Sequence, residues 1–280
     1  MMIDRRQWLA GGAALATAFA AAPLMARVSP ARPIGLQLYT VRELFAPDPI
    51  GTLEKVAGIG YREVEYGGGG YDKMDHAALR KAMDRLSLKC PSIHVGYEAL
   101  AADLGAVVRM ANTLGADTIV LPWLTPAMRD PQVFQRAIGD FNRWAGKLKQ
   151  AGLGFAYHNH DFEFTVKAPD GRSLFDMLVA DGDPALVKIE LDLFWAVAAG
   201  EYPKALIKRL PSRIYAYHVK DRAADGRMVS VGAGTVDFAD IFTLNSQAGV
   251  KHLYVENDQA PAPYLPDIKA SFDHLRRIGA

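Results

Sequence analysis

Two histidines and two acids lie close together in one short, mostly apolar segment, FAYHNHDFEF, at residues 155–164. His158 and His160 are two positions apart, so in a β-strand both side chains face the same side of the sheet. Imidazole is a common metal ligand and an acid/base group that titrates near neutral pH. The chemistry open to this pair therefore depends on the groups that the rest of the chain brings beside it.

Polar residues also end nearly every other apolar segment that has the pattern of a strand. Glu63 and Glu65, Glu190 and Asp192, and His218 and Lys220 repeat the two-residue spacing. One residue from each segment gives a series whose neighbours are 26 to 38 residues apart, about one strand–helix unit: Gln37, Glu65, His94, Leu121, His158, Asp192, His218 and Glu256. Because the carboxyl ends of barrel strands meet at one mouth, we expect these side chains to converge there.

A single divalent metal ion would explain such a cluster. Buried carboxylates and imidazoles without a cation cost several kcal/mol through repulsion and lost hydration. Mixed oxygen and nitrogen ligands suit Mn²⁺, Co²⁺, Zn²⁺, Mg²⁺ or Fe²⁺, and the sequence does not choose among these ions. Each residue alone has a simpler interpretation, since a strand histidine is usually a core or surface residue and a strand-end acid usually caps a helix or pairs with arginine. Convergence from several strands favours the metal.

The elements that would position these residues alternate along the chain. Eight short apolar segments have the pattern of strands, at 34–39, 61–66, 90–96, 117–123, 154–160, 187–193, 214–220 and 253–258. Longer helical patterns lie between them, for example at 75–88, 98–116 and 131–152. Eight such units in about 250 residues predict a (β/α)8 TIM barrel, an α/β fold with a single domain over 33–280. A doubly wound open sheet is the alternative.

The composition restricts the partners of the protein. The 280 residues include 32 basic and 31 acidic side chains, and half of all residues are hydrophobic, as in a soluble globular protein. This balance argues against a nucleic-acid partner, which usually requires a basic excess. The single cysteine, Cys90, excludes an internal disulfide. The run GGGG at 67–70 is a weak phosphate-loop candidate. The oligomeric state stays open, a homo-oligomer included.

The N-terminal segment has the pattern of an export signal. Arg5 and Arg6 precede an uncharged run from Leu9 to Ala22, which is shorter than the ~20 residues that span a bilayer. The paired arginines and the mild, glycine-containing run favour the twin-arginine route over an ordinary secretory signal. We expect residues 1–26 to be a signal peptide and the mature protein to be periplasmic, with no membrane contact after signal removal.

Several segments resemble the sugar phosphate isomerase/epimerase family, whose members have a xylose-isomerase-like barrel: IGLQLYTVRE, YREVEYGG, YHNHDFEF, ELDLFWAVAAG, YAYHVKDR and YVEND. The resemblance extends from about residue 33 to residue 280. It implies one divalent ion held from the ends of strands 5 to 8, which by position are His158, Asp192, His218 and Glu256. Many members have Glu-Asn-His where this chain has His158-Asn159-His160, so either histidine could be the strand 5 ligand.

The resemblance also implies roles in catalysis and binding. The shared chemistry is removal of a proton next to a carbonyl, with the metal stabilising the enediolate. Glu256 would be a ligand and a base, His158 or His160 the second acid/base group, and Lys220 an oxyanion or hydroxyl partner unless it only pairs with Asp221. Candidates for contacting a sugar are Glu65, His94, Gln37, Trp123 and Trp195.

These features predict a divalent-metal-dependent sugar isomerase or epimerase acting on a free sugar or keto-sugar. The alternative on the same metal site is a keto-sugar dehydratase or keto-glycoside lyase that works by β-elimination. Export argues against a phosphorylated substrate. Two other classes are less favoured: a three-zinc repair nuclease of the endonuclease IV type, and a carbohydrate-binding barrel without catalysis.

Overall fold

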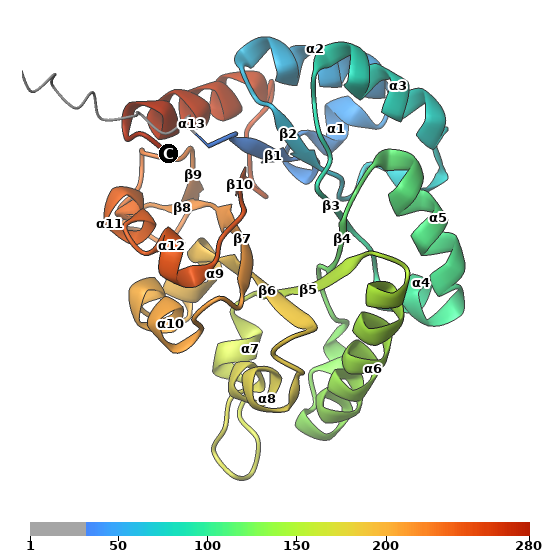
Figure 1. The fold of residues 1–280 in the computed structure, drawn as a ribbon. Coiled ribbons are helices and arrows are strands. Elements are labelled where there is room, and N and C mark those ends of the chain that lie inside the picture. Colours follow the sequence, from blue (N-terminus) through green and yellow to red (C-terminus); the bar gives the residue numbers. More distant parts are fainter. Residues whose placement is uncertain (1–31) are drawn as a thin grey trace, which may run out of the picture. The chain divides into compact units, whose positions relative to one another are not determined.

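Eight parallel strands form the centre of the computed structural model, which describes residues 32–280 (Figure 1). The expected signal peptide, 1–26, lies outside the described residues. The strands are β1 Gly35–Gln37, β2 Glu63–Glu65, β3 Ser92–His94, β4 Thr118–Leu121, β5 Gly154–His158, β6 Val187–Asp192, β7 Ile214–Val219 and β10 His252–Val255. Each overlaps a segment that the sequence pattern predicted as a strand.

The sheet closes on itself almost completely. Its strands are ordered β2-β1-β10-β7-β6-β5-β4-β3, and every ladder is parallel. Between β2 and β3 only isolated parallel bridges are present, pairing Glu63 with Lys89 and Tyr66 with Ile93. Sequential neighbours around a ring confirm the predicted TIM barrel, and the alternative of a doubly wound open sheet is wrong.

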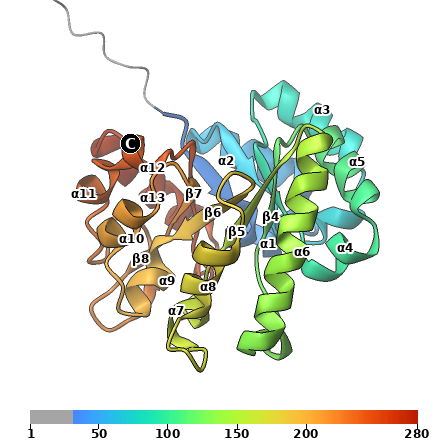
Figure 2. The same ribbon diagram turned by 60° about the horizontal axis from the view of Figure 1, so that its bottom comes forward.

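Helices surround the barrel (Figures 1 and 2). The longer ones are α2 Pro49–Ile59, α3 His76–Leu86, α5 Leu104–Leu114, α6 Pro131–Gln150, α8 Leu174–Asp181, α10 Pro203–Arg209 and α13 Leu265–Arg277. The short ones are α1 Arg42–Phe45, α4 Tyr97–Ala102, α7 Phe162–Thr165, α9 Leu193–Ala198, α11 Phe238–Phe242 and α12 Asn245–Ala248, with 3-10 turns at Leu38–Val41, Tyr71–Lys73 and Pro126–Met128. A small hairpin, β8 Asp221–Arg222 and β9 Met228–Val229, follows β7. No helix among residues 32–280 is long and apolar enough to cross a membrane.

The helical pattern at 98–116 is two helices and not one. Asp103 leaves the helical conformation (φ −152°, ψ 85°), and its side chain accepts a hydrogen bond from the backbone N–H of Ala106. An aspartate in this position caps a helix N-terminus, so α4 ends and α5 begins here. The apolar periodicity continues across the break, which explains why the pattern suggested one helix.

Side chains alternate along the barrel strands, except at a register shift between β6 and β7 where Tyr215 has no partner on β6. In β5, Phe155 and Tyr157 face outward and contact Phe141 of α6, whereas Ala156 and His158 face inward. The lower part of the barrel interior is filled by small and aromatic residues: Val120, Ala156, Tyr215, Ala216 and Tyr254. A Cβ atom at Gly35 would lie 2.5 Å from the Tyr254 ring, so glycine makes room for that ring. Acids and histidines occupy the level above it.

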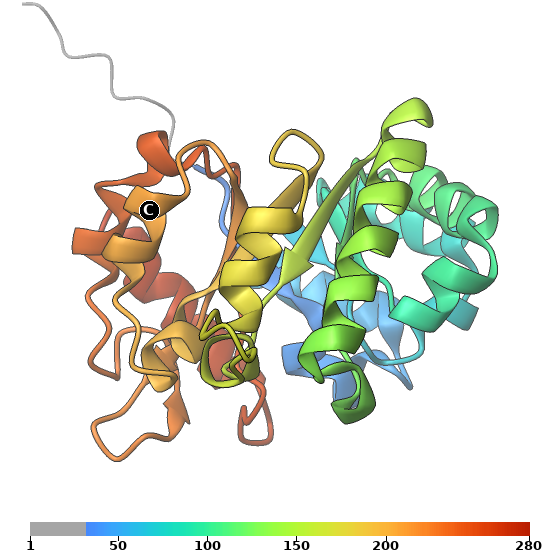
Figure 3. The same ribbon diagram turned by 90° about the horizontal axis from the view of Figure 1, so that it is seen from below.

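The loops that follow β4, β7 and β10 extend from the same end of the barrel (Figure 3). These loops begin at the carboxyl ends of the strands, where TIM barrels place their active sites. The two-residue spacing of polar groups and the alternation of the strands therefore direct the predicted site residues to one mouth.

Candidate active site

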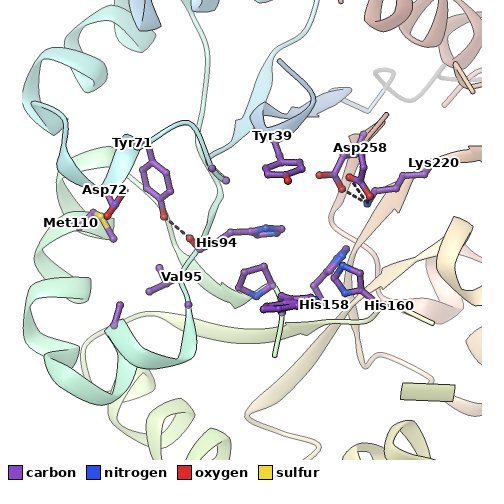
Figure 4. Close-up of a pocket in the computed structure, with 17 residues that line it drawn as sticks. Tyr39, Tyr71, Asp72, His94, Val95, Met110, His158, His160, Lys220 and Asp258 are labelled. Atoms are coloured by element: carbon purple, nitrogen blue, oxygen red, sulfur yellow. Dashed lines mark hydrogen bonds and ion pairs between the residues drawn. The ribbon is translucent and has the colours of Figure 1, made fainter. Parts of the chain in front are cut away.

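A cavity of about 600 Å³ opens at this mouth (Figure 4). The loops after β1, β2, β3, β4, β5, β7 and β10 all contribute to its walls. The residues that line it are Tyr39, Gly67, Gly68, Tyr71, Asp72, His94, Val95, Gly96, Ala99, Met110, Pro122, Trp123, His158, His160, Lys220, Glu256 and Asp258. Six of these were predicted from the sequence as functional residues: His94, Trp123, His158, His160, Lys220 and Glu256.

His218 lies at the centre of the polar cluster and is fully buried. Its Nδ1 is 2.6 Å from Glu256 Oε2, and its Nε2 is 2.8 Å from Glu65 Oε2 and 3.0 Å from Glu190 Oε2. Burial by itself lowers the pKa of His218, but the charges of Glu190 and Glu256 outweigh burial and raise the pKa well above its usual value. In this arrangement the imidazole is a cation shared among three carboxylates.

Lys220 is the second buried cation. Its Nζ lies 2.6 Å from Glu256 Oε2 and 3.0 Å from both Asp192 Oδ2 and Asp258 Oδ2. Burial lowers the pKa of Lys220, whereas Asp192, Glu256 and Asp258 raise it, and the net result is a pKa well above the usual value. Lys220 does not pair with Asp221, whose carboxylate instead accepts hydrogen bonds from backbone N–H groups of the following loop. The simpler interpretation, a Lys220–Asp221 pair, is therefore wrong.

His158 is buried and neutral. Burial lowers the pKa of its imidazole well below the usual value, and the positive charge of His218 adds to this effect. Its Nδ1 is 3.4 Å from Glu190 Oε2 and its Nε2 is 3.7 Å from Asp192 Oδ2. Within the described chain, Nδ1 has no hydrogen-bond partner. A neutral imidazole with an unpartnered nitrogen can bind a metal or accept a proton.

His160 lies beyond the end of β5, on the cavity wall. Burial, followed by the charge of Lys220, lowers its pKa to about 3. Its ring stacks on Phe162 and lies 5.5 Å from the ring of Trp195. Its Nδ1 is buried and makes no hydrogen bond with any of residues 32–280. His160 is thus a second neutral imidazole beside His158, with ring centroids 4.9 Å apart.

Glu163 fixes the backbone after β5 and was not among the predicted site residues. One carboxyl oxygen accepts from the backbone N–H of His160 at 2.7 Å, and the other lies 2.6 Å from the Tyr157 hydroxyl. Burial raises the pKa of Glu163 to about 8. The sequence signal was the second acid in the DFEF segment, whose position three residues after His160 suits a local turn.

Gln37 and Glu65 lie beneath the cavity and do not line it. Gln37 Nε2 donates to Glu65 Oε2 at 2.9 Å, and Ser92 donates to the other carboxyl oxygen. His94 is on the cavity wall, with Nε2 3.0 Å from Glu65 Oε2 and 2.9 Å from Glu190 Oε2. These three residues, all predicted to contact a sugar, therefore differ in position. His94 can reach a ligand, whereas Gln37 and Glu65 are placed to orient the histidines.

The two predicted tryptophans also differ. Trp123 is 43% exposed at the cavity rim. Trp195 does not line the cavity; it packs against Phe194 and His160, and its buried indole N–H has no partner in the part of the chain described. Asp258 was missed, although it repeats the two-residue spacing after Glu256.

The donor set fits a divalent metal ion. Two groups of side chains bring ligand atoms within 4.8 Å of one another: Asp192, His218 and Glu256, and His94, His158, Glu190 and His218. Asp192 Oδ2, Glu190 Oε1 and His158 Nδ1 are buried without a hydrogen bond to any described residue. Asp192 Oδ2 does lie 3.0 Å from Lys220 Nζ, but this ion pair lacks hydrogen-bond geometry. Buried acceptors of this kind are what a cation would satisfy. Three of the four predicted ligands, Asp192, His218 and Glu256, thus form one group. The fourth, His158, belongs to the other group, which shares His218 with the first.

The balance of charge supports the same conclusion. Five buried or half-buried carboxylates meet here, and three side chains carry the opposing charge: His218, Lys220 and His94. The acids Glu65 and Glu190 raise the pKa of His94 to about 9 against the effect of burial, which lowers it. With all five carboxylates ionised, two negative charges stay unbalanced. A metal bound by His218 would displace its proton, which leaves three unbalanced negative charges, and a divalent ion would neutralise two of them.

Solved structures resemble the whole barrel. A sugar phosphate isomerase/epimerase from Parabacteroides distasonis ATCC 8503 has a TM-score of 0.75 and 26% identity, over 88% of this chain and 98% of that chain. The probable 3-DHS dehydratase involved in petrobactin synthesis from Bacillus anthracis has a TM-score of 0.68 over 87% of this chain and 98% of that chain. Its identity is 15%, so that likeness concerns the fold alone.

Sequence relatives and a family model complete the comparison. Inosose dehydratase 2 from Bacillus cereus is 29% identical over 137 residues, 42% of this chain and 45% of that protein. The match thus spans about half the length of the curated relatives. The family model described as "xylose isomerase-like TIM barrel" matches residues 53–278. Because this match includes seven of the eight barrel strands and most of the cavity, the chain belongs to the xylose isomerase-like TIM barrel family, whose members are enzymes that include isomerases, epimerases and dehydratases.

Proposed function

We propose that the protein is a divalent-metal-dependent lyase that removes a proton next to the carbonyl of an uncharged keto-sugar and eliminates a substituent from the β carbon. The leaving group would be a hydroxyl or a glycosidic oxygen, and the reverse addition uses the same groups. One observation supports this most strongly: two imidazoles at the carboxyl end of β5, each with an Nδ1 atom unpartnered within residues 32–280, share the cavity wall with a lysine just after β7 that contacts three carboxylates.

The imidazoles are the candidate bases. The lowered pKa values keep both His158 and His160 unprotonated at neutral pH, with Nδ1 unpartnered within residues 32–280. A base must be deprotonated and within hydrogen-bond reach of the carbon-bound proton, and both rings line the cavity. A low pKa makes a weak base, so the acidity of the substrate proton must be increased by other groups in the site.

Lys220 is the candidate acid and oxyanion partner. Its ammonium group lines the cavity and holds its proton because three carboxylates surround it. In the elimination, an imidazole takes the proton from the α carbon and the freed electron pair forms the carbon–carbon double bond. The bond from the β carbon to oxygen breaks, and Lys220 can donate a proton to the leaving oxygen.

A metal would be held by Asp192, Glu256 and the unprotonated form of His218, with His158 beside them, so binding would release the His218 proton. When bound, it would polarise the carbonyl and stabilise the negative charge that develops on its oxygen. Lys220 and His218 lower the pKa of Glu256 well below its usual value, although burial opposes this shift. Glu256 therefore stays a carboxylate, which suits a ligand better than a proton donor.

The distribution of charge argues against a phosphorylated substrate. Among the described residues that line the cavity, Lys220 is the only lysine or arginine, and it already contacts three carboxylates. Asp72, Glu256 and Asp258 also line the wall. His94, the other cation on the wall, is likewise paired with Glu65 and Glu190. A phosphate or carboxylate would therefore meet repulsion, whereas neutral sugar hydroxyls can donate to the acids.

Epimerisation or isomerisation is the second candidate, because the similar Parabacteroides protein is named as an isomerase/epimerase. Epimerisation on this template uses two acid/base carboxylates on opposite faces of one carbon. Here strand 5 supplies histidine at that position, so the chain offers one carboxylate and two imidazoles. The name of the dehydratase relatives and this asymmetry both favour elimination.

The test is incubation of the metal-loaded protein with keto-sugars in D2O. The proposal expects a product with the ultraviolet absorption of a conjugated enone, and loss of that product in the His158→Gln/His160→Gln double variant. Deuterium incorporation into the recovered sugar without enone would show epimerisation or isomerisation instead. A substrate panel that neither exchanges nor eliminates with any of Mn²⁺, Co²⁺ or Zn²⁺ would contradict both.

A further inference from the structure

The cavity has two chemically different lobes. The polar lobe contains the groups discussed above, with His158, His160, Lys220, Glu256 and Asp258. The apolar lobe is lined by Tyr71, Val95, Ala99, Met110, Pro122 and Trp123. Figure 4 shows Tyr71, Val95 and Met110 on one side of His94, and His158, His160, Lys220 and Asp258 on the other. The proposed reaction involves only the polar lobe, so it does not explain which part of a ligand the apolar lobe would bind.

The apolar character of this lobe is built into its side chains. The Tyr71 hydroxyl donates to the backbone carbonyl of His94 at 2.6 Å, so the tyrosine offers the lobe its ring and not its polar group. Tyr71 is almost fully buried, and the same is true of Val95. Among the described residues that line this end of the cavity, Asp72 is the only charged one; Arg129 contacts Trp123 but does not line the cavity. A hydroxyl could donate to Asp72, whereas an anionic group would be repelled.

Two glycines keep the lobes connected. Gly67 and Gly68 line the cavity between β2 and Tyr71. Gly68 has φ +67°, and a Cβ atom there would lie 2.6 Å from the Tyr39 ring. Glycine therefore lets this wall carry no side chain while Tyr39 stays in place. The first two residues of the run GGGG, a weak phosphate-loop candidate in the sequence, thus form a wall without side chains between the lobes.

Trp123 adds a flat surface at the rim. The guanidinium of Arg129 lies 4.9 Å from the centroid of its ring and 4.0 Å from that of Phe162. Arg129 Nε also donates to the carbonyl of Leu124 at 3.1 Å. These contacts hold the arginine against the tryptophan, whose ring is still 43% exposed. An exposed tryptophan at the rim of an apolar pocket is a stacking surface for a planar ring.

We infer that the apolar lobe binds the uncharged aromatic aglycone of a glycoside whose keto-sugar ring occupies the polar lobe. This inference rests on the proposed function. A volume of about 600 Å³ is in the range of pockets that enclose drug-sized ligands, and the two lobes form one continuous cavity. The apolar side chains of the lobe suit an aromatic ring. An uncharged aglycone also avoids repulsion from the acids at the two ends of the cavity.

This assignment identifies the leaving group. With the carbonyl two carbons from the anomeric carbon, an imidazole takes the proton from the carbon between them. The new double bond forms as the bond between the anomeric carbon and the glycosidic oxygen breaks. That oxygen takes a proton from Lys220, and the aglycone leaves as a phenol. No oxidant or reductant is consumed in this step.

Binding can be measured apart from catalysis by isothermal titration calorimetry of the metal-loaded chain. Phenyl and methyl glucopyranosides, in both anomers, carry no ketone and are not turned over by this chemistry. We expect a phenyl glycoside to bind about tenfold more tightly than its methyl counterpart, or about 1.4 kcal/mol. Equal affinities would overturn the aglycone site and leave the proposed reaction standing, whereas no binding of any glycoside would contradict the carbohydrate site itself.

Variants locate the effect. Ala99→Trp fills the apolar lobe from α4, and Met110→Glu places a charge in it; each should abolish the phenyl preference without changing methyl glycoside affinity. Ala101→Trp is the matched control, because Ala101 is exposed on the same helix and does not line the cavity. A phenyl preference that survives both Ala99→Trp and Met110→Glu would overturn the inference.

Discussion

At the scale of single residues, Lys220 and His218 share the task of neutralising the buried acids of the site. Both contact Glu256 Oε2 at 2.6 Å, and Lys220 also contacts Asp192 and Asp258. Buried charges are tolerated when they are paired, and removal of one partner leaves an uncompensated charge. The metal-free protein thus already contains two buried cations, Lys220 and His218, beside the proposed metal site, and the contribution of Lys220 to stability can be measured.

Lys220→Met should destabilise the metal-free protein by about 3–5 kcal/mol, because three carboxylates lose a common counter-charge. Added divalent metal should recover most of this loss, since it supplies positive charge to Asp192 and Glu256. Chemical unfolding with and without metal gives both numbers. Lys204→Met, which removes the exposed pair with Asp240, is the control and should change stability by about 0–1 kcal/mol. Similar losses in the two variants would refute this account of Lys220.

Glu163 should make the stability of the protein depend on pH. Its pKa is about 8 in the folded chain and about 4.3 when unfolded, so between these values the folded state keeps a proton that the unfolded state releases. The free energy of unfolding therefore falls as pH rises through this window, by up to about 1.4 kcal/mol per pH unit, and levels off above pH 8.

Glu163→Gln mimics the protonated carboxyl, since an amide can donate to the Tyr157 oxygen and accept from the His160 N–H. Denaturant titrations between pH 5 and pH 8 should show a flatter stability profile for this variant than for the wild type. Glu98→Gln, at an exposed position, should keep the wild-type profile. A Glu163→Gln profile parallel to that of the wild type would show that Glu163 is ionised when folded.

Which residues meet at the site could be predicted from the sequence, because the two-residue spacing and one polar anchor per strand determine the face and the end of the barrel. How deep each side chain lies in the barrel could not be predicted. Gln37 and Glu65 follow the same pattern as His94, but they end their strands below the cavity, where Ser92 and His218 surround Glu65. The partners of Lys220 depend on side-chain directions that spacing leaves open.

At the scale of elements, Asp221 organises the loop that carries the β8–β9 hairpin. Its fully buried carboxylate accepts four backbone hydrogen bonds, from Arg222, Gly232, Gly234 and Val236, at 2.8 to 3.2 Å. Met228 of β9 in turn contacts the backbone N–H of Asp258 at the cavity wall. One carboxylate thus holds the loop after β7 together, and Met228 connects this loop to the cavity wall.

Asp221→Asn should loosen this loop selectively, because the amide replaces one acceptor oxygen with a donor that faces backbone N–H groups. Hydrogen–deuterium exchange should quicken in residues 222–236, while the barrel strands keep their protection. Asp225→Asn, in the exposed turn of the same loop, is the control and should leave exchange in the rest of the loop unchanged. Exchange in Asp221→Asn that matches the wild type would contradict the role of this carboxylate.

All eight barrel strands could be predicted from the sequence because apolar runs and helix-ending glycines alternate regularly. The β8–β9 hairpin could not, since strands of two residues have no periodicity. The division of 98–116 at Asp103 was missed for a related reason: the cap is a local hydrogen bond, and the apolar pattern of α4 and α5 runs through it.

At the scale of the whole molecule, part of the cavity lies beside β2 and β3, the neighbouring barrel strands that pair least with each other. Only isolated bridges connect β2 and β3, and the loops that follow these strands carry Gly67, Gly68, Tyr71, Val95 and Gly96 of the cavity wall. The apolar lobe thus lies at the carboxyl ends of these two strands. Small and glycine residues there leave space for a ligand, whereas the well-paired strands β5 to β7 fix the polar groups that must be accurately placed.

We propose that the protein works in the periplasm after export by the twin-arginine route. Residues 1–26 lie outside the described part of the chain, so the proposal rests on Arg5, Arg6 and the uncharged run that follows. Arg5→Lys/Arg6→Lys should retain the protein in the cytoplasm, as measured by cell fractionation and immunoblotting. Arg27→Lys, just beyond the expected cleavage site, is the control. Undiminished export of the double variant would point to the ordinary secretory route.

The most direct test of the account is to count the metal ions bound per chain by elemental analysis after dialysis against Mn²⁺, Co²⁺ or Zn²⁺. We expect close to one divalent ion per wild-type chain, and loss of that ion in Glu256→Gln and His218→Ala. Trp195→Phe, whose indole does not line the cavity, should retain it. A wild-type protein that binds none of the three metals would contradict the proposed metal centre and the lyase chemistry that depends on it.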